Sequence, residues 1–293
     1  MIKILIIYII SFSSLNAYSN YSVDQETITA EVNGISLAYK SVGRDEDPPI
    51  LMIMGLLASH KVWGEQIVNG LVDSGYRVIL FDNRDTGDSE KLDKLGKPNL
   101  YWKYFLYSLG ISFSTPYTLE DMAYDGVALL NHLEIDEAHL VGASMGGMIA
   151  QIIASKYPDK TTSLVSLMSS ASIPGASEIS DRNQENLRNM ENVDSKSAKE
   201  YGFYPRAMPR QLTAIFKAGD RSDILRDITA PTLVLHGEDD ALLPVNYGRL
   251  TAELIENSKF KMYKNMGHNL PKDVIPILIE DIVDFYKDVD EIL

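Results

Sequence analysis

The stretch HLVGASMGGMIAQ, residues 139–151, decides the fold because it joins two kinds of secondary structure through one sharp turn. Its first half is apolar and predicts a buried strand over 138–143. Its second half is rich in small residues and predicts a helix over 145–157. The turn reads Gly142-Ala143-Ser144-Met145-Gly146, a G-x-S-x-G pattern. A serine at such a strand-to-helix turn has its hydroxyl exposed for attack, so we predict that Ser144 is a nucleophile.

Two main-chain amides are predicted to bind an oxyanion beside this serine. The amide of Met145 lies at the start of the predicted helix, where N–H groups lack helical partners and the helix dipole favours negative charge. A second donor is expected from the loop after an early strand, here Met54-Gly55-Leu56. Because Gly55 lets the backbone approach closely, we assign this donor to the amide of Leu56. The alternative is an ordinary strand-to-helix turn.

A serine hydroxyl is a weak nucleophile and needs a base nearby. The chain has five histidines: His60, His132, His139, His236 and His268. His268 follows a strand-like run, on a loop where a parallel sheet presents catalytic groups, and is the predicted base. His236, at the end of another strand-like run, is the alternative base, and His60 could line the pocket. The other two lie within a helix-like and a strand-like run and are interpreted as structural.

The base in turn needs a carboxylate that fixes its tautomer and stabilises the imidazolium. Three carboxylates compete in His236-Gly237-Glu238-Asp239-Asp240, and no acid follows the preceding strand, at 169–172. Asp240 stands three residues after Gly237 and four before Pro244, and we predict that it is the acid. The chain order Ser144, Asp240, His268 is the order expected behind a nucleophile turn of this kind.

Strand-like and helix-like segments alternate along the rest of the chain. Strands are predicted over 27–32, 35–41, 49–54, 77–82, 138–143, 164–168, 232–236 and 260–263, and helices over 60–74, 118–133, 145–157, 247–256 and 274–286. Asn33-Gly34 predicts a hairpin between the first two strands, and Thr118 with Asp121 resembles a capping box. Continuous apolar strands alternating with helices predict an α/β domain with a mostly parallel sheet covered on both faces.

Two segments interrupt this alternation. Residues 101–117 contain seven aromatic side chains, which indicate either an apolar acyl or alcohol pocket or ordinary core and cap packing. Contact of the same segment with a membrane interface could coexist with catalysis. Residues 173 to about 222 are polar and charged without clear periodicity. We therefore predict one domain over residues 23–293 with a cap inserted at about 173–222.

Composition limits the classes of partner. The chain has 293 residues and a formal net charge of −14, with no run of Lys or Arg, so nucleic acid is not an expected partner. It contains no cysteine, which excludes disulfides, thiol nucleophiles and cysteine-based metal sites. Residues 1–22 contain one charged residue, Lys3, followed by an apolar run and then by small polar residues. This pattern predicts a signal peptide and a periplasmic or secreted protein. A buried first strand or an uncleaved anchor is the alternative.

Six stretches in order resemble the α/β-hydrolase superfamily, in particular an esterase-like branch that includes aclacinomycin methylesterase. They are IMGLLASHKVW (53–63), FDNRDTGDS (81–89), YTLEDMAYDGVALL (117–130), HLVGASMGGMIAQ (139–151), APTLVLHGEDDALLP (230–244) and MGHNLP (266–271). The resemblance implies an α/β-hydrolase fold, a triad of Ser144, Asp240 and His268, no cofactor and no metal, and a cap between the sixth and seventh strands. Two positions depart from the pattern: Met54, where many relatives have histidine, and Asp85, where many have glycine.

These predictions point to a serine hydrolase that cleaves a small-molecule carboxylic ester through an acyl-enzyme. Serine rather than aspartate at position 144 argues against dehalogenase and epoxide-hydrolase chemistry, which needs a carboxylate nucleophile. Cleavage of thioesters, lactones or carbon–carbon bonds, and perhydrolysis, remain open for the same three residues. A binding protein on a hydrolase fold is the alternative outside enzymes.

Overall fold

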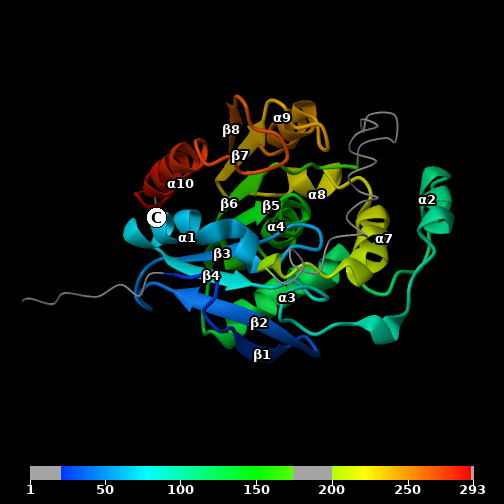
Figure 1. The fold of residues 1–293 in the computed structure, drawn as a ribbon. Coiled ribbons are helices and arrows are strands. Elements are labelled where there is room, and N and C mark those ends of the chain that lie inside the picture. Colours follow the sequence, from blue (N-terminus) through cyan, green and yellow to red (C-terminus); the bar gives the residue numbers. More distant parts are fainter. Residues whose placement is uncertain (1–20, 174–199, 292–293) are drawn as a thin grey trace, which may run out of the picture.

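The computed structural model describes residues 21–173 and 200–291 (Figure 1). The predicted signal peptide therefore lies outside the described residues except for Tyr21 and Ser22, as does the part of the predicted cap at 174–199. Tyr21 is buried, and its main chain exchanges two hydrogen bonds with the side chain of Asn69. In the described parts of the chain, no helix is long and apolar enough to cross a membrane.

Eight strands of the described chain form one sheet in the order β1-β2-β4-β3-β5-β6-β7-β8. They are β1 (Ile28–Val32), β2 (Ile35–Val42), β3 (Pro49–Ile53), β4 (Arg77–Phe81), β5 (Ala138–Ala143), β6 (Thr161–Leu167), β7 (Thr232–Gly237) and β8 (Ser258–Tyr263). The pairs β1–β2 and β2–β4 are antiparallel and the others parallel, which confirms the predicted mostly parallel sheet. Asn33 and Gly34 both have positive φ, as a type I′ hairpin turn requires.

Alternate side chains of the strands fill two hydrophobic cores, one on each face of the sheet. In β3, Leu51 and Ile53 join one core while Ile50 and Met52 join the other. The first core is closed by α3 (Leu119–His132) and α4 (Met145–Lys156), and the second by α1 (Gly64–Asp73) and α10 (Ile275–Asp290). This layering explains why the strands read as continuous apolar runs, and it leaves their carboxyl ends to the loops that carry the site (Figure 1).

The five predicted helices are present with shifts at their ends, whereas α2, α7 and α8 were not predicted. Thr118 and Asp121 form both halves of a capping box at the start of α3, as predicted. The predicted helix over 60–74 is a 3₁₀ turn, η1 (His60–Trp63), followed by α1. The other elements are η2 (Asp93–Leu95), α2 (Leu100–Ser108), η3 (Pro158–Lys160), η5 (Pro205–Ala207), α7 (Met208–Ala218), α8 (Ser222–Arg226) and α9 (Val245–Leu254).

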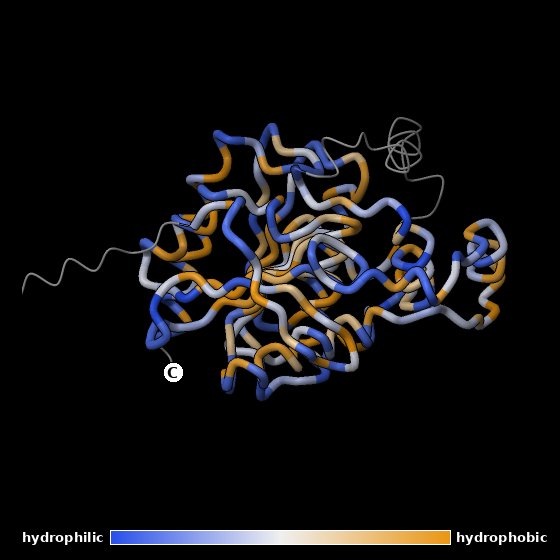
Figure 2. The backbone as a smooth tube through the Cα atoms, turned by 60° about the horizontal axis from the view of Figure 1, so that its bottom comes forward, coloured by the Kyte–Doolittle hydropathy of each residue, from blue (hydrophilic) through white to orange (hydrophobic). Residues whose placement is uncertain are grey.

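The helices α2 and α7 arise in the two segments that interrupt the alternation. α7 lies between β6 and β7 in the chain, where the cap was expected. The rings of Tyr104 and Tyr107 on α2 pack against Phe216 on α7, with centroids 5.5 and 5.9 Å apart. Both helices stand beyond the carboxyl ends of the strands, and α2 forms the outermost part of the described chain on that side (Figures 1 and 2). We call this pair the α2–α7 arm.

Candidate active site

Ser144 lies at the sharp turn from β5 into α4, as predicted. Its backbone has φ 56° and ψ −121°, a conformation that side-chain-bearing residues rarely adopt. The flanking glycines make the turn possible: a Cβ on Gly142 would lie 2.3 Å from the carbonyl oxygen of Gly146, and a Cβ on Gly146 would lie 2.0 Å from that of Ile53. The strained turn lifts the serine side chain from the strand toward the loops at the edge of the sheet.

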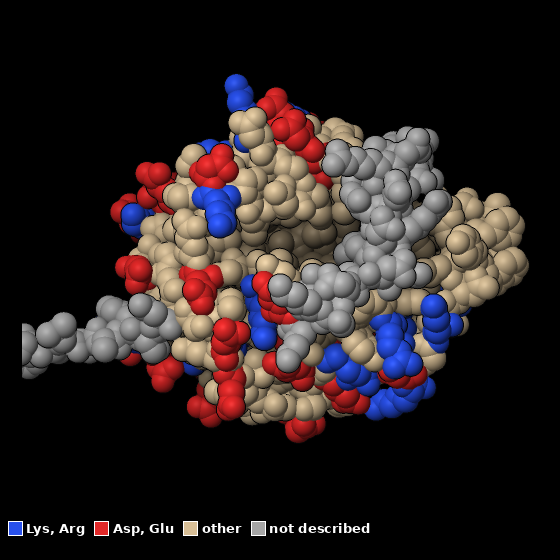
Figure 3. Space-filling view, viewed as in Figure 1, with Lys and Arg blue, Asp and Glu red and all other residues tan. Residues whose placement is uncertain are grey.

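The structure brings Ser144, Asp240 and His268 into one hydrogen-bonded chain. His268, on the loop between β8 and α10, has Nε2 2.9 Å from Oγ of Ser144 and Nδ1 2.8 Å from Oδ2 of Asp240. The side chain of His268 is 20% exposed, whereas that of Asp240 is fully buried. In the view of Figure 1 the surface is hollowed near α4, whose N-cap residue is Ser144 (Figure 3). Such a chain can move a proton between the hydroxyl and the imidazole.

Asp240 is held in its charged form by its surroundings. Burial raises the pKa of this carboxyl, but hydrogen bonds with His236 and His268 and with the amide of Leu243 lower it further, so the net pKa lies well below its ordinary value. Oδ1 accepts from the amides of Leu242 and Leu243 at 3.0 and 2.9 Å, which leaves Oδ2 for His268. An ionised carboxylate at this position favours the imidazolium that forms when His268 accepts a proton.

The other histidines take structural positions. His236, the alternative base, is fully buried; its Nε2 lies 2.7 Å from the carbonyl oxygen of Leu243 and 3.5 Å from Asp240, so it contacts the acid rather than the serine. His139 is buried against Ser163, and burial lowers its pKa to about 4. His60 does not line a pocket, because its ring is fully buried and lies 2.7 Å from Oδ1 of Asp82.

The loop that carries Leu56 lies directly beside the nucleophile. A Cβ on Gly55 would lie 3.0 Å from Cβ of Ser144 and 3.5 Å from its Oγ, so the glycine permits this approach. Among the described residues, the main-chain amides of Leu56 and Met145 have no hydrogen-bond acceptor. Two unpaired amides next to Oγ are what an oxyanion would need, and sequence analysis had selected both.

Gln211 contacts this loop and was not predicted from the sequence. It lies on α7 with its side chain fully buried, and its Oε1 accepts from the amide of Leu57 at 2.8 Å. Leu57 has φ 62°, so the loop is strained immediately after Leu56. The Nε2 of Gln211 also donates to the carbonyl oxygen of Arg84 at 3.3 Å. The cap helix therefore fixes the loop after β3 to the loop after β4.

The unusual Asp85 is explained by a second contact from α7. Asp85 has φ 73°, a conformation that favours glycine, yet its carboxylate is fully buried against Arg210. The guanidinium of Arg210 donates to the Asp85 carboxylate through Nε at 2.6 Å and through Nη2 at 3.0 Å. The hydroxyl of Tyr117 and the amide of Leu92 also donate to this carboxylate. These hydrogen bonds satisfy the buried charge and attach α7 to the loop after β4.

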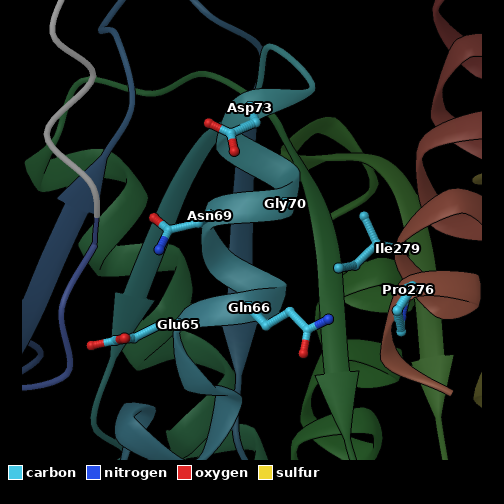
Figure 4. A pocket seen from close by; sticks show the side chains of 7 residues that line it. All are labelled: Glu65, Gln66, Asn69, Gly70, Asp73, Pro276 and Ile279. Carbon is cyan, nitrogen blue, oxygen red and sulfur yellow. The ribbon is translucent and has the colours of Figure 1, made fainter. Parts of the chain in front are cut away.

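The prediction that 101–117 forms an apolar acyl or alcohol pocket is not met by the described residues. Of its seven aromatic residues Tyr117 alone is buried, and Tyr101, Trp102 and Phe105 are exposed. A cavity of about 500 Å³ lies elsewhere, between α1 and α10, and contains none of the predicted site residues (Figure 4). Across residues 21–173 and 200–291, no group of three or more His, Asp or Glu side chains could hold a metal ion.

A nucleophile turn after β5, an acid after β7 and a histidine after β8 on a mostly parallel sheet define the architecture of an α/β hydrolase. Comparison with known families agrees: residues 48–205, more than half of the chain, match the alpha/beta hydrolase fold family. The chain therefore belongs to this family.

Methylesterase relatives support the esterase-like branch that the sequence motifs indicated. The chain is similar to rhodomycin D methylesterase DnrP of Streptomyces peucetius, 31% identical over 137 residues, which is 47% of this chain and 40% of that protein. The chain thus spans less than half the length of that relative. The bifunctional esterase/perhydrolase DCH of Acinetobacter calcoaceticus is 24% identical over 87% of this chain and 97% of its own.

Among solved structures, the enol-lactonase from Burkholderia xenovorans LB400 superposes with a TM-score of 0.70, at 20% identity, over 89% of this chain and all of that one. Identity at this level shows a common fold. It gives no substrate for this chain.

Proposed function

We propose that this hydrolase cleaves small-molecule carboxylic esters through an acyl-enzyme, with Ser144 as nucleophile, His268 as general base and Asp240 as its orienting acid. The observation that carries the proposal is the position of His268, whose two ring nitrogens lie within 2.9 Å of Ser144 Oγ and Asp240 Oδ2. A histidine between a serine and a buried carboxylate is arranged for nucleophilic catalysis. No cofactor is needed for this chemistry.

In the acylation step, Oγ of Ser144 attacks the ester carbonyl carbon while Nε2 of His268 takes its proton. Asp240 accepts a hydrogen bond from Nδ1–H and stabilises the imidazolium without taking the proton. The carbonyl oxygen becomes an oxyanion, which the amides of Leu56 and Met145 are placed to bind. His268 then donates its proton to the leaving alkoxide oxygen, the tetrahedral intermediate collapses, and the alcohol departs.

Deacylation repeats the same steps with water in place of serine. His268 takes a proton from a water molecule, and the hydroxide formed attacks the acyl carbon. The second tetrahedral intermediate releases Oγ of Ser144, which recovers its proton from His268 as the carboxylic acid leaves. Fixed amide dipoles at Leu56 and Met145 serve both intermediates, so one arrangement supports both halves of the reaction.

An ester is favoured over the other substrates of such a triad by the named activities of the relatives. A relative that matches over 137 residues is named as a methylesterase, and a relative matched over nearly its full length is named as an esterase and perhydrolase. Because a lactone is an internal ester, the enol-lactonase likeness is compatible with the same attack on a carbonyl group. A binding protein would not need the unpaired amides beside Ser144.

The test is hydrolysis of p-nitrophenyl esters from acetate to laurate by the purified protein beside Ser144→Ala. We expect release of p-nitrophenolate that Ser144→Ala abolishes, with an acyl-enzyme visible as a burst or by mass spectrometry. Ser169→Ala is a suitable control, because the hydroxyl of Ser169 donates to the main-chain oxygen of Ser144 and not to its Oγ. If Ser144→Ala remained fully active, or if the wild type bound an ester without turnover, the proposal would be wrong.

A parallel panel of thioester, lactone and peracid-forming assays identifies the bond that is preferred. We further propose that residues 1–22 direct export to the periplasm or outside the cell. Cell fractionation with N-terminal sequencing tests this: cleavage after Ala17 or Ser19 is expected, and an intact N-terminus in the cytoplasmic fraction would contradict it.

A further inference from the structure

The outer side of α2 presents large apolar side chains to solvent. Tyr101 is 91% exposed, Trp102 56% and Phe105 48%, and Leu109 and Ile111 continue the exposed surface just past the helix. Trp102 and Phe105 stack on one another with ring centroids 5.5 Å apart. Figure 2 shows this orange segment standing apart from the body of the protein. We call these five residues the aromatic tip. An apolar surface of this kind marks an interaction site.

The inner side of α2 holds the tip in place. Tyr104 and Tyr107 pack on Phe216 of α7, and Lys103 donates from Nζ to the carbonyl oxygen of Ser114 at 2.8 Å. The helix also has an N-cap, since the side chain of Asn99 accepts from the amide of Trp102. The exposure of the tip is therefore a property of a supported helix, with separate inward and outward faces.

The charge around the tip is opposite in sign to the charge of the whole protein. Residues 94–119 contain three lysines and no acid, and residues 201–219 contain two arginines, one lysine and no acid, in a chain of net charge −14. These are the segments that form the α2–α7 arm. Figure 3 shows the tip in tan with blue side chains gathered beside it. Lys94, Arg206 and Arg210 are paired with Glu90, Asp93 and Asp85. At physiological ionic strength the screening length is about 8 Å, so the lysines close to the tip matter more than charges far from it.

Three of these cations have no carboxylate partner among the described residues: Lys97, Lys103 and Lys217. Lys103 and Lys217 both lie near the ring of Phe113, with their Nζ atoms 5.3 and 5.9 Å from its centroid. A groove of about 480 Å³ is lined by Lys97, Arg206 and Arg210 together with one acid, Asp93. Cations flanking exposed aromatic rings match a surface that is anionic outside and apolar beneath.

We propose that the aromatic tip docks on anionic lipid bilayers, with Trp102 and Phe105 entering the headgroup region and Lys97, Lys103 and Lys217 contacting lipid phosphates. Tryptophan and tyrosine favour the membrane interface because one end of each ring is apolar and the other polar. A protein partner fits the tip less well, because a stable protein interface buries about 1,600 Å² in total and a single projecting helix offers little flat surface. The net charge of −14 keeps the rest of the molecule off the membrane.

The test uses the chain's own tryptophans as reporters. The chain has two, and Trp63 is buried while Trp102 is exposed. Fluorescence is measured for Ser144→Ala, so that no lipid is hydrolysed, with vesicles of phosphatidylcholine alone or with phosphatidylglycerol. We expect a blue shift and quenching by brominated lipid in anionic vesicles, neither of which Trp102→Phe shows. The signal of Trp102 is the part of the change in fluorescence that Trp102→Phe removes. Membrane contact through residues 1–22 alone would not quench Trp102, and the measurement does not depend on catalytic activity.

Two sets of variants separate the apolar and charged contributions. Phe105→Ser with Tyr101→Ser should abolish the quenching, whereas Ile277→Ser, at an exposed position on α10, should leave it unchanged. Removing Lys97, Lys103 and Lys217 as glutamines should weaken binding to anionic vesicles about fivefold for each lysine. Lys264→Gln, a lysine outside the arm, is the control.

Absence of lipid quenching of Trp102 at every lipid composition would overturn the proposal. Equal binding by the Tyr101→Ser, Phe105→Ser variant would overturn it as well. Sedimentation velocity tests whether the tip binds a second copy of the chain instead. A dimer that these substitutions dissociate, without lipid quenching of Trp102, would overturn the proposal and identify the tip as a contact between copies.

Discussion

The carboxyl edge of the sheet and the α2–α7 arm differ in what they bury and what they expose. At the edge, the charged groups are buried and paired: Asp240 receives hydrogen bonds from two amides and His268. On the arm, aromatic rings face solvent near lysines that have no carboxylate partner among the described residues. The comparison teaches that the edge is organised from within the molecule, by strain and hydrogen bonds, while the arm is organised toward something outside it. Four predictions test where this division holds.

The largest effect is expected at the edge itself. Ser144→Ala should lower kcat on p-nitrophenyl esters by at least roughly 10⁴-fold, because no other group can form the acyl-enzyme. Trp102→Ser, on the arm, should stay within about twofold of wild type on a water-soluble ester. The measurement is steady-state kinetics on acetate and butyrate esters. A large loss in the Trp102 variant would show that the arm belongs to the catalytic edge.

The second prediction concerns the ion pair that joins the two regions. Arg210→Ala leaves Asp85 buried without its cation and should destabilise the protein by about 3–5 kcal/mol. Arg210→Met combined with Asp85→Asn removes both charges and should recover a good part of that loss. Urea unfolding followed by circular dichroism gives both values. If Arg210→Ala alone proved neutral, α7 would not depend on this pair.

The third prediction concerns acid stability far from either region. His139 has an ordinary pKa of 6.5 when unfolded and about 4 when folded, because burial disfavours its charged form. The unfolded chain therefore binds more protons than the folded one as pH falls from about 6.5 to about 4, and stability is lost over that window, by at most about 3 kcal/mol. His139→Gln should flatten this part of the stability curve. His132→Gln, on the exposed end of α3, is the control and should leave it unchanged.

The smallest effect tests how the arm reaches the edge. Gln211→Ala removes the acceptor for the amide of Leu57 and should lower kcat about tenfold, since a neutral hydrogen bond contributes about 1 kcal/mol and the strained loop relaxes. KM should change little, because the loop positions an oxyanion donor used in the transition state. Lys217→Gln on the same helix is the matched control. A parallel rise in KM with unchanged kcat would assign Gln211 to substrate binding instead.

Sequence alone predicted most of the sheet and the residues that the edge brings together, because local patterns determine them. Apolar runs specify the strands, Asn33-Gly34 specifies the hairpin, and the glycines around Ser144 specify the turn. Since parallel strands end at one edge, side chains following β5, β7 and β8 had to converge there. The two amides that we propose bind the oxyanion follow from the same topology.

The contacts of the cap could not be predicted in this way. Gln211 meets Leu57 across 154 positions of sequence, and Arg210 meets Asp85 across 125, so neither pair leaves a local pattern. The aromatic residues at 101–117 were interpreted as a pocket or as packing, with contact to a membrane interface as a further possibility. Tyr104 and Tyr107 do pack on Phe216, whereas Tyr101, Trp102 and Phe105 are exposed. Pro209 in the first turn of α7 was a usable signal for a helix start within the predicted cap.

The bond between Gln211 and Leu57 has a consequence for engineering and for evolution. An inserted cap could be exchanged for another cap in order to change specificity. Here the lid helix contributes part of the support for the oxyanion loop, so a graft that preserved every core residue would still detach Leu57 from its acceptor. A successful chimaera would have to carry Gln211 and Arg210 with it, or restore glycine at position 85 and find another acceptor for the loop.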